Sequence, residues 1–283
     1  LGAWDTPYDT RFGTSMKYVE LVVNGEYRGL YGIFEPVDSR QLEISDQEYL
    51  YKRTYGRELL AETMDSVDPS EYLTVLGMEL KGRNGQGNGA DWKCFRTFVE
   101  MCQSDDETFQ AEAEKLLNMD NVADIWLYLQ MMYAEDNIYK NMFFAFKKES
   151  DGYRMYLVPW DTDLTWGNTY VDDGEQLYVQ WSPEHAQDYL EWPFLDRLLK
   201  LDVGNIREKV AARWQKLRQD ENLKNMLDDC IHEVQDSGAF ARDAARWPDS
   251  RHDGDYEGME SYLKTRIAWL DKTMKNMDEQ IEK

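Results

Sequence analysis

Hydrophobic and polar residues alternate along Lys17–Val23, and this run ends in Asn24-Gly25 before a second run, Glu26–Phe34. Alternation predicts a strand with one buried face, and Asn-Gly is the strongest short signal for a tight hairpin turn. Tyr49–Arg53 has the composition of a further short strand. Lys81–Ala90 carries four glycines but lacks the Gly-Lys-Ser/Thr ending of a phosphate-binding loop, so it predicts a connector.

A helical pattern dominates after residue 90. The clearest case is Asn121–Tyr133, whose apolar residues recur at three- and four-residue spacing, with Asp120 placed to cap the amino-terminal end. Further helices are predicted over Asp91–Cys102, Asp106–Leu117, Pro193–Leu199, Gly204–Arg218, Asn222–Gln235, Phe240–Arg246 and about Tyr256–Ile281. The fold class is therefore α+β, with a β-rich portion at 1–90 and a larger, mainly helical portion at 91–283.

Two strand-like runs, Met142–Lys148 and Tyr153–Val158, interrupt the helical portion and are joined by residues typical of a hairpin turn. A hairpin brings its two ends together. Asn141 at the entrance and Asp161 just past the exit are therefore predicted to lie side by side, with Asp136 close behind. Such a group of oxygen acceptors suits Mg²⁺ or Mn²⁺, whose shell is completed by substrate phosphates and water.

Asp136 and Asn141 stand in the order Asp-x-x-x-x-Asn. In the catalytic loop of protein kinases, this Asp orients or deprotonates the accepting hydroxyl and this Asn holds a metal. The pattern alone arises often by chance, but Asp161 and Asp163 add a second acidic element beyond the hairpin. Two such carboxylates repel each other unless a cation or hydrogen-bond donors compensate. Asx turns or a helix cap at these two residues remain the alternative.

The composition limits the class of partner. The net charge is −23, from 55 acidic and 32 basic residues, which argues against nucleic acid or an anionic membrane as the partner. Acidic residues that only solvate the helices would give the same balance. Three scattered cysteines and three scattered histidines predict neither a disulfide framework nor a zinc site. No apolar run approaches the ~20 residues of a membrane span.

Two motifs make the chain similar to a known family. Asn24–Tyr31 reads Asn-Gly-x-Tyr-x-Gly-x-Tyr, and Pro159–Gly167 reads Pro-Trp-Asp-x-Asp-x-Thr-x-Gly. Together with Glu35–Asp38 and Asp136–Asn141, they resemble the spore coat protein H (CotH) kinase family. The resemblance is clear from Lys17 to Gly167, and the helical remainder is compatible with it.

The resemblance implies a single domain over residues 1–283 with a diverged, two-lobed protein-kinase-like fold. It implies an atypical Ser/Thr kinase that transfers the γ-phosphoryl group of ATP, with Mg²⁺ or Mn²⁺, to a secreted, cell-surface, spore-coat or cellulosome-associated protein. Asp136 would then be catalytic, and Asn141, Asp161 and Asp163 would hold metal. Lys52 would contact phosphate, and Trp160 would stack on adenine. An edge-strand surface lysine and a core-packing tryptophan are the alternatives for the last two.

One departure and three competing functions remain. Family members carry a basic, glycine-containing β segment ahead of the Asn-Gly hairpin, whereas only Leu1–Met16 precedes it here. Either this sequence starts within the domain or this member has lost part of its amino-terminal lobe, and in both cases weaker ATP binding and activity are expected of these residues alone. The main competitor is a catalytically silent binding module of a cell surface or extracellular assembly. A structural Ca²⁺ site at Asp161, Asp163, Asp172 and Asp173 and a glycosidase with paired carboxylates are weaker alternatives. For a kinase, the acidic charge favours a basic, Ser-rich acceptor protein.

Overall fold

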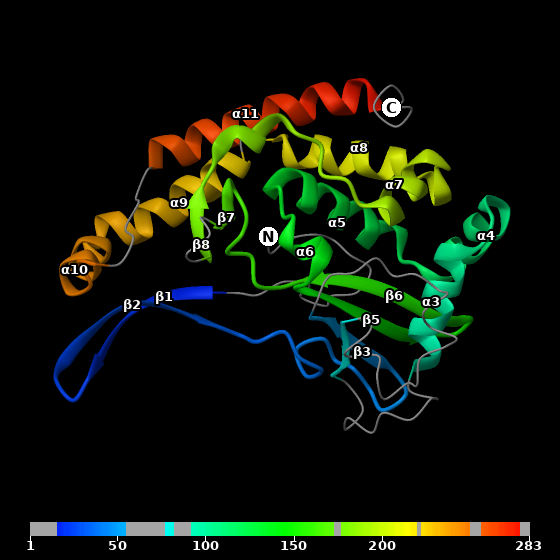
Figure 1. Cartoon of the computed structure of the whole chain (residues 1–283), viewed down its shortest axis with the longest axis horizontal. Helices are drawn as coiled ribbons and strands as arrows, with labels where there is room; N and C mark the ends of the chain where they lie inside the picture. Colours follow the sequence, from blue (N-terminus) through cyan, green and yellow to red (C-terminus); the bar gives the residue numbers. More distant parts are fainter. Residues whose placement is uncertain are drawn as a thin grey trace.

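The computed structural model describes residues 16–54, 77–81, 92–172, 177–219, 222–249 and 256–277, and it has a mixed α+β architecture (Figure 1). Its strands are β1 (Met16–Val23), β2 (Glu26–Phe34), β3 (Tyr49–Arg53), β4 (Met78–Leu80), β5 (Met142–Glu149), β6 (Gly152–Pro159), β7 (Asn168–Asp172) and β8 (Leu177–Trp181). All strand pairs are antiparallel.

The helices account for most of the remaining described chain. The α-helices are α3 (Lys93–Gln103), α4 (Asp106–Leu116), α5 (Met119–Met132), α6 (Asp136–Tyr139), α7 (Pro193–Lys200), α8 (Ile206–Leu217), α9 (Asn222–Asp236), α10 (Ala239–Arg246) and α11 (Tyr256–Lys275). Two short 3₁₀ turns are η3 (Pro183–Gln187) and η4 (Val203–Asn205). Among the described helices, none is long and apolar enough to cross a membrane.

The central sheet has the strand order β4-β3-β5-β6, so β3 is an interior strand. Successive side chains of a strand point to opposite faces, and here both faces are covered. Tyr51 and Phe144 belong to the large core that the sheet shares with the helices, whereas Leu50 and Phe143 belong to a smaller cluster closed by Val37 and other residues of the segment after β2. Burial on both sides fixes the register of β3 and β5.

Helix α5 forms the centre of the helical portion, and ten of its 14 residues are buried. A helix that is apolar around most of its circumference requires neighbours on several sides, and β6, α8 and α11 supply them. Its amino-terminal cap is Asn118, whose side chain accepts a hydrogen bond from the Asn121 amide. The prediction that Asp120 is the cap is wrong, because Asp120 lies within the first turn and pairs with Lys209 at 2.8 Å.

Strands β1 and β2 form a separate two-stranded ribbon, which confirms the predicted Asn-Gly hairpin. In Figure 1 this ribbon extends away from the sheet and reaches below α10. Glu20 of β1 accepts two hydrogen bonds of 2.7 Å from Arg242 of α10, and the Leu30 amide donates to Asp243 at 2.7 Å. Gly29 permits this close approach, because a Cβ atom there would lie 2.5 Å from the Asp243 carboxylate.

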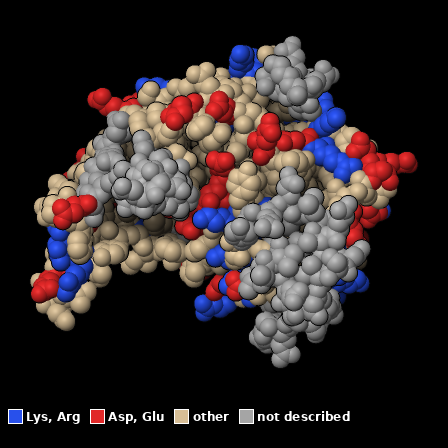
Figure 2. All heavy atoms as spheres, in the orientation of Figure 1, with Lys and Arg blue, Asp and Glu red and all other residues tan. Residues whose placement is uncertain are grey.

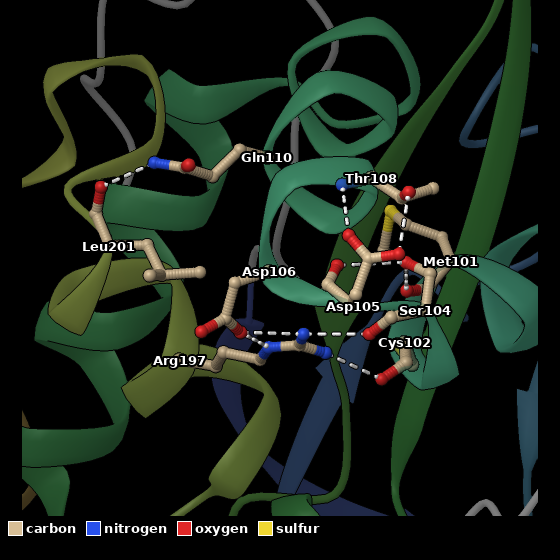
Figure 3. Close-up of polar contacts among 9 residues, drawn as sticks. All are labelled: Met101, Cys102, Ser104, Asp105, Asp106, Thr108, Gln110, Arg197 and Leu201. Carbon is tan, nitrogen blue, oxygen red and sulfur yellow. Dashed lines mark hydrogen bonds and ion pairs between the residues drawn. The ribbon is translucent and has the colours of Figure 1, made fainter.

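Arg197 joins α7 to the turn between α3 and α4 (Figure 3). Its guanidinium donates to the carbonyls of Cys102 and Ser104 at 2.9 and 2.7 Å and pairs with Asp106 at 2.7 Å. The guanidinium carbon also lies 4.2 Å from the centre of the Phe109 ring. One planar side chain therefore satisfies carbonyls left open at the carboxyl end of α3 while it fixes the position of α4.

Some predicted segments are confirmed by the structure, one pair of strands was not predicted, and other predicted segments lie outside the described residues. The helix expected over Asp91–Cys102 is α3, and the hairpin over Met142–Val158 is formed by β5 and β6, which confirms both. Asp172 ends β7, in a second hairpin that the sequence did not predict. The glycine-rich connector after Lys81, Leu1–Ser15, Asp173 and the last residues of the predicted final helix lie outside the described residues.

Candidate functional site

The two ends of the central hairpin meet as predicted. Asn141 precedes β5, and its carbonyl accepts a hydrogen bond of 3.0 Å from the Trp160 amide, just after β6. The Asn141 amide donates to the Arg53 carbonyl of β3 at 3.1 Å, so three strands converge on this residue. Asn141 has φ 57°, a left-handed conformation that asparagine tolerates better than most residues.

A buried asparagine that the sequence did not single out holds this junction together. The Asn137 side-chain nitrogen donates to the carbonyls of Asn141 at 2.8 Å and Trp160 at 2.9 Å, and its oxygen accepts from the Tyr128 hydroxyl at 3.0 Å. All three hydrogen bonds lie in a water-poor environment, since Asn137 is 1% exposed. Losing this side chain would remove the Asn137 donor from the Trp160 carbonyl and one of two donors from the Asn141 carbonyl, which is costly in a buried site.

Asp136 lies directly against Asn141. The Asn141 side-chain nitrogen donates to Asp136 Oδ2 at 2.6 Å, and the Lys140 ammonium is 3.4 Å from the same oxygen. Burial raises the pKa of Asp136, the neighbouring Lys140 and Asn141 lower it in part, and the negative charge of Asp163 raises it. The result is a carboxylate with a pKa above its usual 3.8, one oxygen of which is already hydrogen-bonded.

Asp161 and Asp163 are exposed on the loop that follows β6. The loop is fixed by hydrogen bonds from Thr165 to the Thr162 carbonyl at 2.8 Å and from the Trp166 amide to the Met132 carbonyl at 2.8 Å. Asp161 has φ 56°, which turns the chain sharply at the hairpin exit. A further hydrogen bond, from the Asn168 side chain to the Asp163 carbonyl at 3.1 Å, holds the end of this loop.

The oxygen ligands available suit a hard divalent cation that keeps part of its shell for other molecules. In the part of the chain that the structure describes, no three His, Cys, Asp or Glu residues form a group that could hold a metal by themselves. The Asn141 nitrogen donates to Asp136, so its amide oxygen is the acceptor that remains. An amide oxygen with one or two carboxylates is a typical protein contribution to a Mg²⁺ site, where phosphates and water supply the other ligands.

Lys52 lies on the sheet face next to this junction. Its ammonium is 4.4 Å from the centre of the Trp160 ring and 5.8 Å from that of Phe143, both cation–π distances. Burial lowers the pKa of Lys52 and the Lys81 charge lowers it further, while Glu79 and Asp161 act in the opposite direction. The alternative that placed Lys52 on an edge strand is wrong in that respect, because β3 lies between β4 and β5.

A cavity of about 240 Å³ opens on the other side of Asp136. Asp136 and Glu135 contribute carboxylates to its wall, and Tyr133 and His185 form a flat aromatic side, with parallel rings 5.1 Å apart. Leu164, Gly167, Asn168, Thr169, Ser182 and Tyr139 complete the lining. In Figure 2, acidic side chains spread over the described part of one face, and near its middle, beside α6, they adjoin basic ones.

Arg266 of α11 packs against Tyr133, one of the two aromatic residues of this cavity wall. It is fully buried and donates to the carbonyls of Gln130 at 2.5 Å and Asp188 at 2.6 Å, which connects the end of α5 to the segment after η3. Its guanidinium carbon lies 5.4 Å from the Tyr133 ring and 4.2 Å from the Trp269 ring. Burial lowers the pKa of Arg266 to about 10, so it stays protonated at neutral pH.

Of the sequence-predicted residues, Asp136 and Asn141 are in direct contact, and Trp160 is joined to Asn141 through the backbone and to Lys52 through its ring. Asp161 and Asp163 lie on the adjoining loop.

A protein-family model described as CotH kinase protein matches residues 12–270 of the chain. A search of curated proteins found no match.

Proposed function

The chain belongs to the CotH kinase family, and we propose on that basis that it is an atypical protein Ser/Thr kinase. In this proposal, residues 1–283 form one kinase-like domain with two lobes, and the domain transfers the γ-phosphoryl group of ATP to a serine or threonine of another protein. The observation that carries the proposal is the 2.6 Å contact between Asn141 and Asp136 at the end of the central hairpin, beside Lys52 and the acidic loop. Phosphoryl transfer requires mainly positioning and charge neutralisation, and these are the properties this group of residues has.

Asp136 is proposed to receive the proton of the acceptor hydroxyl. Its Oδ2 atom is engaged by Asn141 and Lys140, which leaves Oδ1 for the acceptor. The hydroxyl oxygen attacks the γ-phosphorus, the bond from that phosphorus to the bridging oxygen breaks, ADP departs, and the proton moves to Asp136. A pKa raised by burial makes Asp136 a better base than an ordinary aspartate.

Asn141, Asp161 and Asp163 are proposed to hold Mg²⁺ or Mn²⁺. When bound, such an ion neutralises the phosphate charge during transfer. The protein offers few ligands of its own, so the phosphates of ATP would complete the shell, and metal and nucleotide would bind cooperatively. Lys52 is proposed to contact a phosphate, and Trp160 to lie beside the nucleotide, with its ring already occupied on one side by the Lys52 ammonium.

The acceptor is proposed to enter through the 240 Å³ cavity, because Asp136 forms part of that wall. Glu135 and Asp136 place negative charge there and Tyr133 and His185 place aromatic faces there, so a basic neighbour of the accepting serine would be attracted. The chain's net charge of −23 acts in the same direction. A secreted, cell-surface or spore-coat protein is the proposed class of acceptor, as the family name suggests.

The test is a thermal-shift titration with ATP and Mn²⁺ or Mg²⁺ on the wild type and on Asp161→Ala. A ligand that binds only the native state raises the melting temperature by mass action, by the equivalent of about 2.7 kcal/mol at a hundred times its Kd. We expect stabilisation that requires both ligands together and that is lost in Asp161→Ala. Asp151→Ala, which removes an exposed carboxylate in the β5–β6 turn, is the matched control and should respond like the wild type.

A parallel assay follows transfer of radiolabelled γ-phosphate to a Ser- and Lys-containing peptide. Asp136→Asn should bind ATP with metal and yet transfer at least ~100-fold more slowly, as is typical when a general base is removed. If ATP with metal stabilises neither the wild type nor the control, the silent binding module of a cell surface becomes the better description. If calcium stabilises the chain without nucleotide, a structural Ca²⁺ site becomes the better description.

A further inference from the structure

The face of the central sheet that carries Lys52 bears two further charged side chains. The register places Lys52 directly opposite Glu79 of β4 on one side and Phe143 of β5 on the other. Directly opposite residues of an antiparallel pair project from the same face of the sheet. Glu79 therefore lies on the face that also carries Lys52, Phe143 and, beyond the hairpin exit, Trp160.

Lys81 belongs to the same face. It follows Glu79 by two residues, and its ammonium pairs with the Glu79 carboxylate at 2.7 Å. Its backbone is fixed, because the Lys81 amide donates to the Leu50 carbonyl of β3 at 2.8 Å. Met78 before Glu79 and Leu80 after it pack against the helical core on the other face, which confirms the alternation.

The three charges form a compact group with net positive charge. Lys81 lies close enough to lower the pKa of Lys52, and both Glu79 and Asp161 lie close enough to oppose that effect. Two neighbouring ammonium groups repel each other, and the Glu79 carboxylate, which is opposite Lys52 and paired with Lys81, offsets the repulsion. Side chains of Glu79 and Lys81 are each 38% exposed, so an anion from solvent has access to them.

We propose that Lys81 is a second phosphate-binding lysine, which Glu79 holds beside Lys52, and that the two lysines together bind the terminal phosphates of a nucleoside triphosphate. This assignment rests on the proposed kinase function and adds a binding residue to it. It also gives Glu79 a defined role. In the absence of phosphate Glu79 occupies the Lys81 ammonium, and a phosphate oxygen must compete with that carboxylate for it.

This competition predicts that two substitutions change the affinity for phosphate in opposite directions. Lys81→Met removes a cation and should weaken phosphate binding. Glu79→Gln removes the competing carboxylate, releases Lys81 and should strengthen phosphate binding. A pair that serves only to stabilise the strand would not give opposite changes in affinity, because either substitution would break the same bond.

Isothermal titration calorimetry with sodium tripolyphosphate in metal-free buffer measures this directly. We expect the Kd of Lys81→Met to rise about fivefold and that of Glu79→Gln to fall by a similar factor, as for one unit charge at about 4 Å in water. Lys115→Met is the matched control, since it breaks an ion pair of 2.8 Å with Glu112 on the remote helix α4. Its affinity should equal that of the wild type.

The assignment is overturned if Lys81→Met binds tripolyphosphate with wild-type affinity, if both variants bind it equally more weakly, or if the wild type does not bind it. Circular dichroism establishes that each variant is folded. The titration needs neither metal nor transfer. If the tripolyphosphate result fails while binding of ATP with Mn²⁺ still depends on Asp161, only the role of Lys81 is refuted. Opposite-signed effects here without any phosphoryl transfer would instead count against the kinase function alone.

Discussion

Replacing Arg266 by Met should destabilise the protein far more than any exposed arginine would. Arg266 is fully buried, and its guanidinium donates to the carbonyls of Gln130 at 2.5 Å and Asp188 at 2.6 Å. Methionine fills much of the same volume but donates no hydrogen bond, so both carbonyls would lose their donor in a site closed to water. The stacking of the guanidinium on Trp269 at 4.2 Å would be lost as well.

The magnitude follows from these contacts. Each charge-assisted hydrogen bond contributes about 1.5–3 kcal/mol, and the cation–π contact about 1–2 kcal/mol. The desolvation of a buried charge, which methionine avoids, offsets several kcal/mol of this total. The contacts total about 4–8 kcal/mol before this offset, so we expect a net loss of about 2–4 kcal/mol in the free energy of unfolding. For a chain of this size the melting temperature should fall by about 10 °C.

Guanidinium chloride unfolding followed by circular dichroism measures the loss, with Arg40→Met as the matched control. Arg40 pairs with Asp38 on the surface, where its side chain is 88% exposed, and its removal should cost no more than about 0.5 kcal/mol. Arg266→Lys should recover only part of the stability, because one ammonium cannot reach both carbonyls in the geometry of a planar fork. The reasoning is refuted if Arg266→Met lies within about 1 kcal/mol of the wild type, or if Arg266→Lys restores stability fully.

Two more predictions concern other contacts. Arg197→Met should lower the free energy of unfolding by about 2–3 kcal/mol, because its hydrogen bonds to the α3–α4 turn are lost. Urea unfolding measures this loss, and a loss no larger than that of Arg40→Met would contradict the role drawn in Figure 3. The acid limb of the pH profile of kcat/KM should lie above the usual pKa of 3.8, because burial raises the pKa of Asp136 and activity is lost as the pH falls through that raised pKa. Lys140→Met, which removes a charge that lowers this pKa, should move the limb to higher pH, and a move to lower pH would exclude Asp136 as the base.

Local sequence signals predicted the elements whose cause is itself local. Asn24-Gly25 specified the turn of the β1–β2 ribbon, with φ values of 54° and 80° that these residues adopt readily. The turn residues before Gly152 likewise specified the hairpin of β5 and β6. Because a hairpin fixes where its ends meet, the contact between Asn141 and the residue before Asp161 could be anticipated as well.

Features that depend on distant partners could not be read from the sequence. Strand β4 has three residues and exists because β3 pairs with it, which no periodicity reveals. Asn137 reads as an ordinary turn residue, yet it joins both ends of the hairpin once they meet. Arg266 lies within a polar stretch typical of a surface helix, and only the packing of α11 on α5 makes it a buried donor. The Asn118 cap was missed because Asp120 is an equally good cap by composition.

The attachment of the β1–β2 ribbon to α10 also bears on the order in which the chain can fold during synthesis. The partners of Glu20 and Leu30 follow them by 222 and 213 residues. A ribosome makes about 5–20 residues per second, so the ribbon waits on the order of ten seconds or more for α10 to emerge. An isolated two-stranded hairpin is marginally stable in water at best. Through that interval the side chains that are partly buried in the finished structure, such as Val19 and Leu30, stay available to other chains. Strands β1 and β2 are therefore made before the other described strands but are among the last to be secured.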